Sequence, residues 1–325
     1  MRAVLCTEYG AQDKLSIGDV ADPVAGPGEV VIDMAAASLN FPDLLVIAGL
    51  YQFKPEPPFV PGAEGAGIVS EVGADVTHIE VGQRVMAVGV QGAFADKWVI
   101  DAGSVIPIPD DMDFETAASL TLAFGTSYHA LKQRAALEPG ETLLVLGAAG
   151  GVGSAAIEIG KTMGATVIAA ASTDEKLEFC RELGADMTIN YATEDLKTRV
   201  KELTGGRGAD VIYDPVGGEF SEQAFRSIAW KGRHLVIGFA SGDIPSIPLN
   251  LPLLKGADIV GVFWGSFTSR EHEENMRNGA ELFQMLSDGT LKPRVTNIFP
   301  LEDYESAFDL MASRQATGKV VLRIN

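Results

Sequence analysis

Cysteine is scarce in this sequence, because only Cys6 and Cys180 occur and they stand far apart. Two distant cysteines provide neither a disulfide framework nor a metal-binding cluster, and we expect both to be buried apolar fillers. The four histidines are scattered, at His78, His129, His234 and His272. Because none has a second ligand at close spacing, the sequence predicts no tetrahedral Cys/His metal site.

Long hydrophobic runs are also missing. The longest apolar stretches, such as Leu143–Leu146 and Ile259–Trp264, have the length of strands, whereas a membrane helix needs about 20 residues. The N-terminal residues lack the apolar core and the small-residue cleavage site of an export signal. We therefore expect no membrane span and a cytoplasmic protein.

Positive charge is under-represented. The 25 Lys and Arg residues stand against 44 Asp and Glu residues, which gives a net charge of −19 at pH 7. Such a chain repels polyanions, so nucleic acid is not an expected partner. What is present is an ordinary globular composition, 46% hydrophobic and 21% charged, in 325 residues, enough for about two domains.

The chain changes character near residue 122. Before it, short strands broken by Gly and Pro predict a β-rich domain: Glu29–Met34, Ala66–Val72, Arg84–Val88 and Ala95–Ile100. After it, strand, turn and helix repeat, with six strands: Thr142–Leu146, Thr166–Ala170, Met187–Asn190, Asp210–Tyr213, Arg233–Ile237 and Asp258–Phe263. This order predicts an α/β fold with a doubly wound parallel sheet. The elements after Trp264 have no further repeat to join, so we expect them to return to the first domain.

A glycine-rich turn follows the first of these six strands. It reads Gly147-Ala148-Ala149-Gly150-Gly151-Val152-Gly153 and leads into a helical segment. In such a turn Gly150 lets the backbone approach a pyrophosphate, Gly153 lets the helix pack closely on the strand, and the first helical N–H groups bind the anion. Ala148 replaces one glycine of the G-x-G-x-x-G pattern, but the turn opens the first repeat, where a dinucleotide fold requires it. A purely structural glycine turn is the alternative.

The end of the second strand indicates which dinucleotide is bound. An acidic side chain there accepts hydrogen bonds from the ribose hydroxyls of NAD, but this segment ends in Ser172. Lys176 follows one helical turn later, and Tyr191 follows the third strand. A hydroxyl, an ammonium and a phenol can hold a 2′-phosphate, so we predict NADPH as the cofactor. The alternative is that Ser172 only caps a helix and Lys176 is only a solvated surface residue.

Four separated motifs stand in order along the chain: Ser38–Asp43, Pro61–Gly67, Gly147–Gly153 and Thr317–Val321. With the two-domain order, they resemble the zinc-free quinone oxidoreductase (ζ-crystallin-like) group of the medium-chain dehydrogenase/reductase superfamily over essentially the whole length. The resemblance implies a GroES-like β-barrel catalytic domain at 1–122, a Rossmann NADP-binding domain at 123–264, and a return to the catalytic domain at 265–325. It also implies a homodimer.

The resemblance bears on metal use as well. The ligand positions of zinc-dependent relatives correspond here to Asn40, Ala63 and Leu122, and the four-cysteine structural zinc loop is absent. These side chains are not zinc ligands, so the resemblance implies chemistry without a metal. An alkoxide then lacks its usual stabilisation by a Lewis acid, which argues against an alcohol dehydrogenase.

The cofactor contacts are implied by the same resemblance. It places Asn40 and Thr126 near the nicotinamide ribose, and Gly150, Gly151 and Val152 at the pyrophosphate. The other implied contacts are Ser172, Lys176, Tyr191 and Arg314 at the 2′-phosphate, and Gly238, Phe239, Phe263 and Trp264 at the edge of the carboxamide and the active site. Arg314 as an exposed helix-end residue, and the aromatic pair as interface or core packing, are the alternatives.

Tyr51 and Asn40 are the catalytic candidates. Tyr51 lies in the segment 49–53, which is expected to loop over the cleft, and it is a candidate donor to a developing oxyanion; a packing role is the alternative. A quinone needs only hydride and a proton from solvent, so positioning dominates. We predict an NADPH-dependent reductase of a quinone or related conjugated carbonyl acceptor. The alternatives are a double-bond reductase acting on an enone, a 2-haloacrylate or an enoyl thioester, and a non-catalytic NADPH-binding protein.

Overall fold

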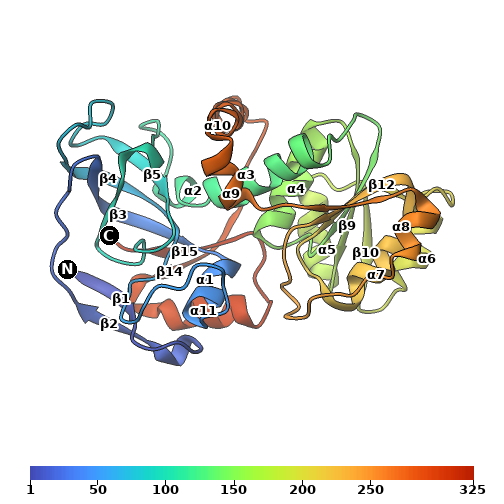
Figure 1. Cartoon of the computed structure of the whole chain (residues 1–325), viewed down its shortest axis with the longest axis horizontal. Helices are drawn as coiled ribbons and strands as arrows, with labels where there is room; N and C mark the ends of the chain where they lie inside the picture. Colours follow the sequence, from blue (N-terminus) through green and yellow to red (C-terminus); the bar gives the residue numbers. More distant parts are fainter. The chain divides into compact units, whose positions relative to one another are not determined.

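The computed structural model describes all 325 residues, which divide into two compact units (Figure 1). The first unit comprises Met1–Leu122 and Pro293–Asn325, and the second comprises Ala123–Lys292. The first division falls where the composition changes. The second differs from the expected return at residue 265, because the chain stays with the second unit as far as Lys292.

The late return has a physical reason in the helix α10 (His272–Ser287). The hydroxyl of Tyr128 donates a hydrogen bond to the Glu281 carboxylate, and the Gln133 amide donates to Asn278 Oδ1 at 2.8 Å. These contacts attach α10 to the segment that begins the second unit. The sequence did not show which unit this helix would contact.

The first unit is built on a mainly antiparallel sheet. Its strands are β1 (Arg2–Cys6), β2 (Leu15–Asp19), β3 (Glu29–Leu39), β4 (Glu64–Val72), β5 (Arg84–Val88), β6 (Lys97–Asp101), β7 (Val105–Pro107), β14 (Val295–Pro300) and β15 (Lys319–Arg323). Its helices are η1 (Gln12–Lys14), α1 (Phe41–Ile47), η2 (Ala102–Ser104), α2 (Phe114–Ala117), η4 (Leu301–Asp303) and α11 (Tyr304–Ala312). Seven strands form one sheet in the order β14-β15-β3-β4-β5-β7, with β6 also paired to β3, while β1 and β2 pair separately.

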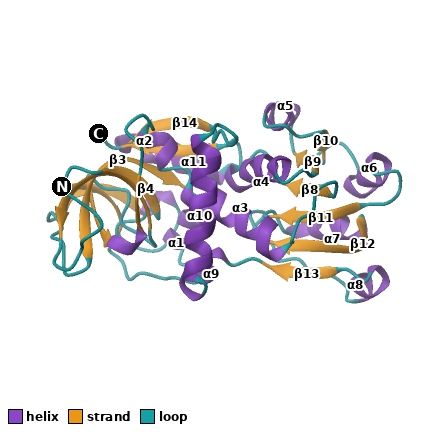
Figure 2. Ribbon diagram, turned by 90° about the horizontal axis from the view of Figure 1, so that it is seen from above, coloured by secondary structure: helices purple, strands orange, loops and turns teal.

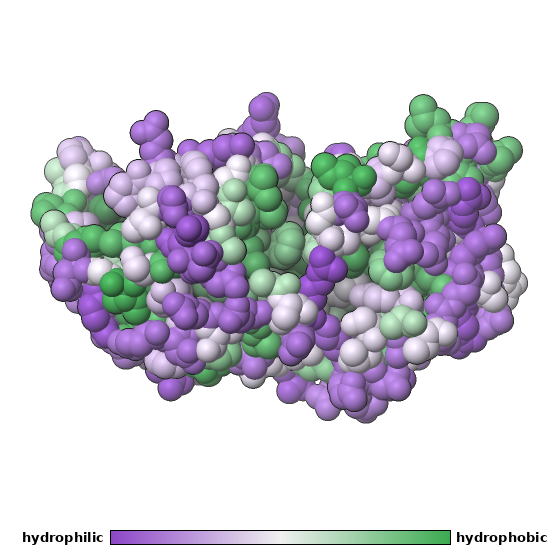
Figure 3. Space-filling view, turned by 90° about the horizontal axis from the view of Figure 1, so that it is seen from below, coloured by the Kyte–Doolittle hydropathy of each residue, from purple (hydrophilic) through white to green (hydrophobic).

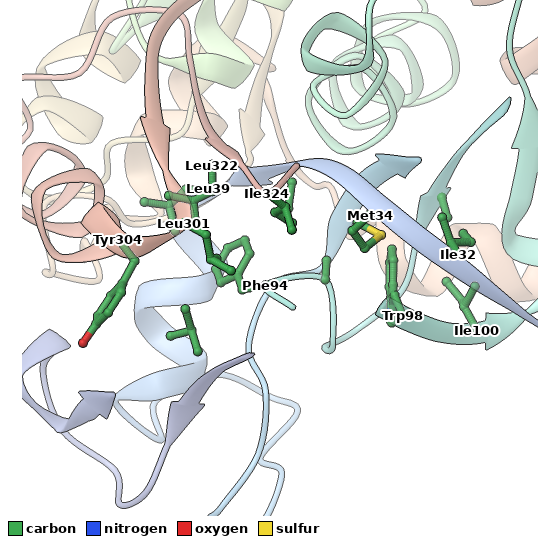
Figure 4. Packing of buried hydrophobic residues seen from close by; sticks show 14 of the residues in the cluster. Ile32, Met34, Leu39, Phe94, Trp98, Ile100, Leu301, Tyr304, Leu322 and Ile324 are labelled. Atoms are coloured by element: carbon green, nitrogen blue, oxygen red, sulfur yellow. The ribbon is translucent and has the colours of Figure 1, made fainter. Parts of the chain in front are cut away.

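The core of this unit joins segments from both ends of the chain. Phe94 packs edge-on against Phe308 of α11, with ring centroids 6.1 Å apart. Figure 4 shows Phe94 together with Leu39 and Leu322, which come from the paired strands β3 and β15. All four side chains are buried. Because burying such side chains is the main favourable term in folding, this core explains why the C-terminal residues return to the first unit.

The second unit is a doubly wound α/β domain. Its strands are β8 (Thr142–Leu146), β9 (Thr166–Ala171), β10 (Met187–Asn190), β11 (Ala209–Asp214), β12 (Ile228–Val236) and β13 (Asp258–Gly261). Its helical segments are α3 (Thr121–His129), which crosses the division, η3 (Ala130–Arg134), α4 (Gly151–Thr162), α5 (Asp174–Glu182), α6 (Leu196–Leu203), α7 (Gly218–Arg226), α8 (Asn250–Lys255), α9 (Trp264–Arg270) and α10. The strands form one parallel sheet in the order β10-β9-β8-β11-β12-β13 (Figure 2).

The six predicted strands of this domain are confirmed, with differences of a few residues at their ends. Every residue of β8 is buried, as expected of a strand covered on both faces by helices. Helix α5 is capped by Thr173, whose hydroxyl accepts from the Lys176 N–H, so the capping alternative for Ser172 is wrong. Cys6 and Cys180 are both buried. None of the helices is long and apolar enough to cross a membrane.

Candidate functional site

The glycine turn between β8 and α4 has the shape of an anion cradle. Gly150 precedes the first residue of α4, and a Cβ on it would meet only the Gly147 carbonyl oxygen, at 3.4 Å. A Cβ on Gly153 would lie 2.4 Å from that same oxygen, so only glycine lets α4 pack this closely. An open approach at Gly150 and the N–H groups of a helix of 12 residues fit a dinucleotide pyrophosphate.

The first turn of α4 is held by α3. The Ser127 hydroxyl donates to the Val152 carbonyl oxygen at 2.9 Å and also meets the Tyr213 hydroxyl of β11 at 2.8 Å. Thr126, the predicted ribose contact, is the residue next to Ser127 on α3. Burial raises the pKa of Tyr213 well above its usual range, so its phenol stays protonated and can act as a donor in this contact. Thr126 is thus adjacent in the chain to the residue that contacts the predicted pyrophosphate residue Val152.

Three predicted 2′-phosphate residues lie at the carboxyl ends of β9 and β10. The Lys176 ammonium lies 3.5 Å from the Ser172 hydroxyl, and the Tyr191 N–H donates to the Ala171 carbonyl at 3.1 Å. The Tyr191 ring rests on Phe220 with centroids 4.4 Å apart. Partial burial lowers the pKa of Lys176. The backbone of Tyr191 is thus bonded to the last residue of β9, next to Ser172, although Tyr191 is distant from Ser172 in sequence.

Arg314 is the fourth residue predicted at the 2′-phosphate. It is an exposed residue just after α11, with a left-handed φ of 58°, and it belongs to the first unit. Its proposed contact with a 2′-phosphate therefore stays a prediction.

The predicted residues at the carboxamide edge follow β12 and β13. The Gly238 N–H donates to the Asp214 carbonyl at 3.4 Å, and Phe239 comes next in the chain. Phe263 is 53% exposed and precedes the first residue of α9. Trp264 packs on Gly125 of α3, where a Cβ would lie 2.7 Å from its ring, so the close packing there requires glycine.

Three residues of the first unit form a buried charged cluster. The Lys319 ammonium donates to Asn40 Oδ1 at 2.6 Å and to Glu64 Oε2 at 3.2 Å. The Asn40 Nδ2 donates to Glu64 Oε2 and to the Ser38 carbonyl, each at 3.1 Å. The other carboxylate oxygen of Glu64 accepts the Leu122 N–H at 2.7 Å. The side chains of Lys319 and Glu64 are 4% and 1% exposed.

Asp43 and Tyr51 lie close to this cluster. Asp43 Oδ2 accepts the Asn40 N–H at 2.7 Å, at the start of α1. Burial raises the pKa of Asp43 to about 7, against the smaller opposing effects of that hydrogen bond and of the Lys319 charge. Burial and the Asp43 charge raise the pKa of Tyr51, whose ring packs partly buried against the core of the unit. Both candidate catalytic residues, Asn40 and Tyr51, thus lie in one polar region of the first unit.

Sequence reasoning missed two features of the site. Lys319 was noticed only as part of a motif, although the pairing of β15 with β3 and of β3 with β4 places 319, 40 and 64 at the same edge. The second is a buried group in the Rossmann domain: Asp214 Oδ2 accepts from Ser221 and lies 3.1 Å from His234 Nε2. The hydrogen bonds from His234 and Ser221 outweigh burial and hold the pKa of Asp214 below its usual value.

The resemblance assigns Asn40, Ala63 and Leu122 to the zinc-ligand positions of metal-dependent relatives. Asn40 holds Lys319 and Glu64, Ala63 is buried beside Glu64, and Leu122 contributes its backbone N–H. No group of three or more His, Cys, Asp or Glu side chains is clustered in a way that could hold a metal ion. Amide and aliphatic side chains are not the thiolate, imidazole or carboxylate ligands that zinc takes in proteins.

Comparison with known proteins decides the family. A family model described as zinc-binding dehydrogenase matches residues 151–282, and one described as alcohol dehydrogenase GroES-like domain matches residues 26–110. Quinone oxidoreductase-like protein 2 of Rattus norvegicus is 39% identical over 324 residues, which cover 99% of this chain and 92% of that protein. The chain belongs to the quinone oxidoreductase group of the medium-chain dehydrogenase/reductase superfamily.

Two further members of this superfamily are similar along their full length. The quinone oxidoreductase of Escherichia coli, solved in complex with NADPH, superposes with a TM-score of 0.94 at 30% identity, with complete coverage of both chains. The 2-haloacrylate reductase of a Burkholderia species is 33% identical, with 98% of each chain covered. The predicted family and fold class are confirmed. The chain is an oxidoreductase of a family that uses a nicotinamide cofactor, with a GroES-like and a Rossmann domain.

Proposed function

We propose that this enzyme transfers hydride from NADPH to a quinone or a related conjugated carbonyl acceptor, without a metal. The observation that supports the choice of cofactor is at the ends of β9 and β10, where the Lys176 ammonium lies 3.5 Å from the Ser172 hydroxyl and the Tyr191 N–H donates to the Ala171 carbonyl. No carboxylate follows β9 directly, and the next one, on Asp174, accepts a hydrogen bond from Asn190 at 2.9 Å. A cation and two hydroxyls in this place attract a phosphate and do not repel it.

The residues of the chain provide for each part of the cofactor. Gly150, Gly151 and Val152 would hold the pyrophosphate, Thr126 and Asn40 the nicotinamide ribose, and the strand-end residues Gly238, Phe239, Phe263 and Trp264 the carboxamide edge. When bound, NADPH supplies a hydride. The chain then has to orient the acceptor and, where negative charge develops on a carbonyl oxygen, to offer a hydrogen-bond donor.

Tyr51 is the donor we propose for that oxygen. Its raised pKa keeps the phenol protonated, which is the form that donates. The chain offers no metal ligands at the position where zinc-dependent relatives polarise their substrates. A quinone accepts hydride readily, and its product can take a proton from solvent, so a quinone suits a site that works mainly by positioning.

A second function is favoured by a specific likeness. One full-length relative is named a 2-haloacrylate reductase, so a reductase of activated double bonds is the alternative. An anionic acrylate needs a cation, and Lys54 is the only Lys or Arg between Lys14 and Arg84. This scarcity favours neutral quinones and enones.

One substrate panel tests the proposal. Purified enzyme is assayed with NADPH and with NADH against quinones, enones, acrylates and enoyl thioesters, before and after exhaustive chelation. We expect the highest kcat/KM with a quinone, at least tenfold tighter binding of NADPH than of NADH, and full activity after chelation. Higher kcat/KM with an acrylate or enoyl thioester would establish the alternative. Activity that disappears along with one zinc per chain would refute the metal-free mechanism.

We also propose a homodimer formed through the free edge of the Rossmann sheet. The edge strand β13 pairs only with β12, and apolar side chains beside it are exposed: Trp230, Ile244, Leu249, Leu253, Leu254 and Ile259. Figure 3 shows hydrophobic residues gathered at the part of the surface formed by α8. An edge strand and an apolar patch of this kind suit a second copy of the chain. Light scattering of the Leu253→Glu variant should show a monomer where the parent shows a dimer.

A further inference from the structure

We propose that Lys319 and Glu64 are positioning residues for the cofactor, because together they fix the side-chain amide of Asn40 in the orientation that offers its oxygen to the nicotinamide ribose. This inference rests on the proposed use of NADPH. It concerns the buried cluster of the first unit, in which the motif residue Lys319 had no assigned role.

The orientation of the Asn40 amide follows from the chemistry of its two neighbours. An ammonium only donates hydrogen bonds and an ionised carboxylate only accepts them. Lys319 at 2.6 Å therefore requires Oδ1 on its side, and Glu64 at 3.1 Å requires Nδ2 on the other. Rotating the amide by 180° would place an N–H group against the ammonium and an oxygen against the carboxylate. The structure thus allows one orientation.

The hydrogen-bonding capacity left on Asn40 is that of an acceptor. Both N–H groups of Nδ2 are used, one by Glu64 and one by the Ser38 carbonyl. Oδ1 has two lone pairs, of which Lys319 occupies one. A ligand that meets Asn40 must therefore donate a hydrogen bond, as a ribose hydroxyl does. A ligand carbonyl, including the oxygen of a quinone, finds no donor there, so Asn40 is a cofactor residue and not an oxyanion donor.

The cluster is rigid because its members come from three adjacent strands and are buried. Lys319 begins β15, Asn40 directly follows β3, and Glu64 begins β4. The ammonium and the carboxylate neutralise each other, which a buried charge requires. Asn40 itself is only 6% exposed, so its side chain has little freedom to reorient.

The experiment compares two ligands. NADPH carries the nicotinamide ribose, whereas 2′,5′-ADP carries the adenosine 2′-phosphate and lacks that ribose. Dissociation constants are measured by calorimetry for the parent, Lys319→Met, Asn40→Ala, and the double variant Lys319→Met/Asn40→Ala. We expect Lys319→Met and Asn40→Ala each to weaken NADPH about tenfold and to leave 2′,5′-ADP within twofold. Because Lys319 acts through Asn40, the double variant should be no weaker than Asn40→Ala alone.

Two further variants separate positioning from folding. Lys319→Met leaves the Glu64 charge buried and unpaired, so Lys319→Met/Glu64→Gln removes both charges and should restore the melting temperature. We expect this neutral pair to stay about tenfold weaker for NADPH. The matched control is Lys97→Met on β6, which removes a lysine of the same unit that pairs with Asp22 and Asp33 and should change neither constant.

The outcomes are distinguishable. Equal weakening of NADPH and 2′,5′-ADP, or parental NADPH affinity in the neutral pair, would overturn the positioning role and leave the proposed function intact. Additive losses in Lys319→Met/Asn40→Ala would show that Lys319 does not act through Asn40. A parent protein that binds neither ligand would overturn the proposed function and this inference together.

Discussion

Each unit of the enzyme contains a lysine beside a proposed cofactor contact, and the two lysines lie in opposite environments. Lys319 in the first unit is 4% exposed and is held by Asn40 and Glu64. Lys176 in the second unit is partly exposed and lies 3.5 Å from the Ser172 hydroxyl. The buried charge is neutralised by the protein, and we propose that it orients its neighbours, whereas we propose that the charge nearer the surface attracts a phosphate.

The two sites also differ in how far apart their residues stand in the sequence. In the Rossmann domain, the turn from Gly147 to Gly153 and the pair Ser172 and Lys176 lie within short stretches of sequence. In the GroES-like domain, the cluster joins residues 40, 64 and 319 through strand register. We therefore expect the site in the Rossmann domain to tolerate changes elsewhere in the chain. The cluster in the GroES-like domain forms only when its three segments are correctly paired.

The largest effect we expect is in the locally encoded site. In Gly153→Ala the new Cβ would lie 2.4 Å from the Gly147 carbonyl oxygen, so α4 must move away from β8. We expect the affinity for NADPH to fall at least a hundredfold, by about 2.7 kcal/mol or more. Fluorescence titration measures it. Gly150→Ala, where the nearest atom is 3.4 Å away, is the graded comparison and should lose less than Gly153→Ala. Equal losses would refute the steric account.

The same two sites differ in how much of them could be predicted from the sequence. The glycine turn, the six strands and the proximity of Lys176 to Ser172 were predictable because their signals are local: Gly at fixed offsets, apolar runs and a spacing of one helical turn. The return at Pro293, and not at residue 265, was not, because the contacts between α10 and Tyr128 depend on tertiary packing. The Lys319 cluster was missed for a related reason. A lone lysine in a strand gives no sign of burial or of its partners.

The next prediction concerns the catalytic role of Tyr51 in the first unit. Tyr51→Phe removes the only donor we propose for a developing oxyanion. With an enone or enoyl thioester, kcat should fall about 10²- to 10³-fold, whereas with a quinone it should fall less than about tenfold, because solvent can protonate the product. Steady-state kinetics with both substrate classes measure the difference.

Tyr304→Phe is the control for Tyr51→Phe, since its buried hydroxyl bonds the Leu15 carbonyl in the same unit. It should not distinguish the two substrate classes. A small loss with both classes in Tyr51→Phe would assign Tyr51 to packing. A large loss with quinones at unchanged NADPH affinity would contradict catalysis by positioning.

A third prediction tests the environment of the buried cluster through pH. The pKa of Asp43 is about 7 in the folded protein and about 4 when unfolded, so the folded state binds this proton more tightly. Ionising Asp43 therefore costs stability as pH rises from about 4 to 7, and the loss is complete above pH 7. Lys319, Glu64 and the Asn40 N–H face this carboxyl and are unchanged in Asp43→Asn.

Urea unfolding at pH 4.5, 6 and 8 measures that effect. Relative to the parent, the free energy of unfolding of Asp43→Asn should rise by about 2 to 4 kcal/mol across this range. The sign matters more than the size, because an ordinary ion-paired aspartate would give the opposite slope. Parallel pH profiles for the two proteins would show that Asp43 ionises with an ordinary pKa. Water would then have more access to the region around Asn40 than its burial suggests.

The smallest expected effect concerns Lys176, the more exposed of the two lysines. Lys176→Ala should remove about 1–2 kcal/mol of the preference for NADPH over NADH, because a charge-assisted contact partly exposed to water contributes about that much. Titrations with both cofactors should show NADPH weakened about 5- to 30-fold and NADH unchanged. The control is Lys197→Ala, which removes an exposed lysine on α6 of the same unit and should alter neither constant.

If Lys197→Ala weakened NADPH binding as much as Lys176→Ala, the preference for NADPH would come from the overall electrostatic potential of the domain. If neither variant changed the affinity for NADPH, binding of the 2′-phosphate would depend on Ser172 and Tyr191. The difference in burial between Lys176 and Lys319 would then not correspond to a difference in function.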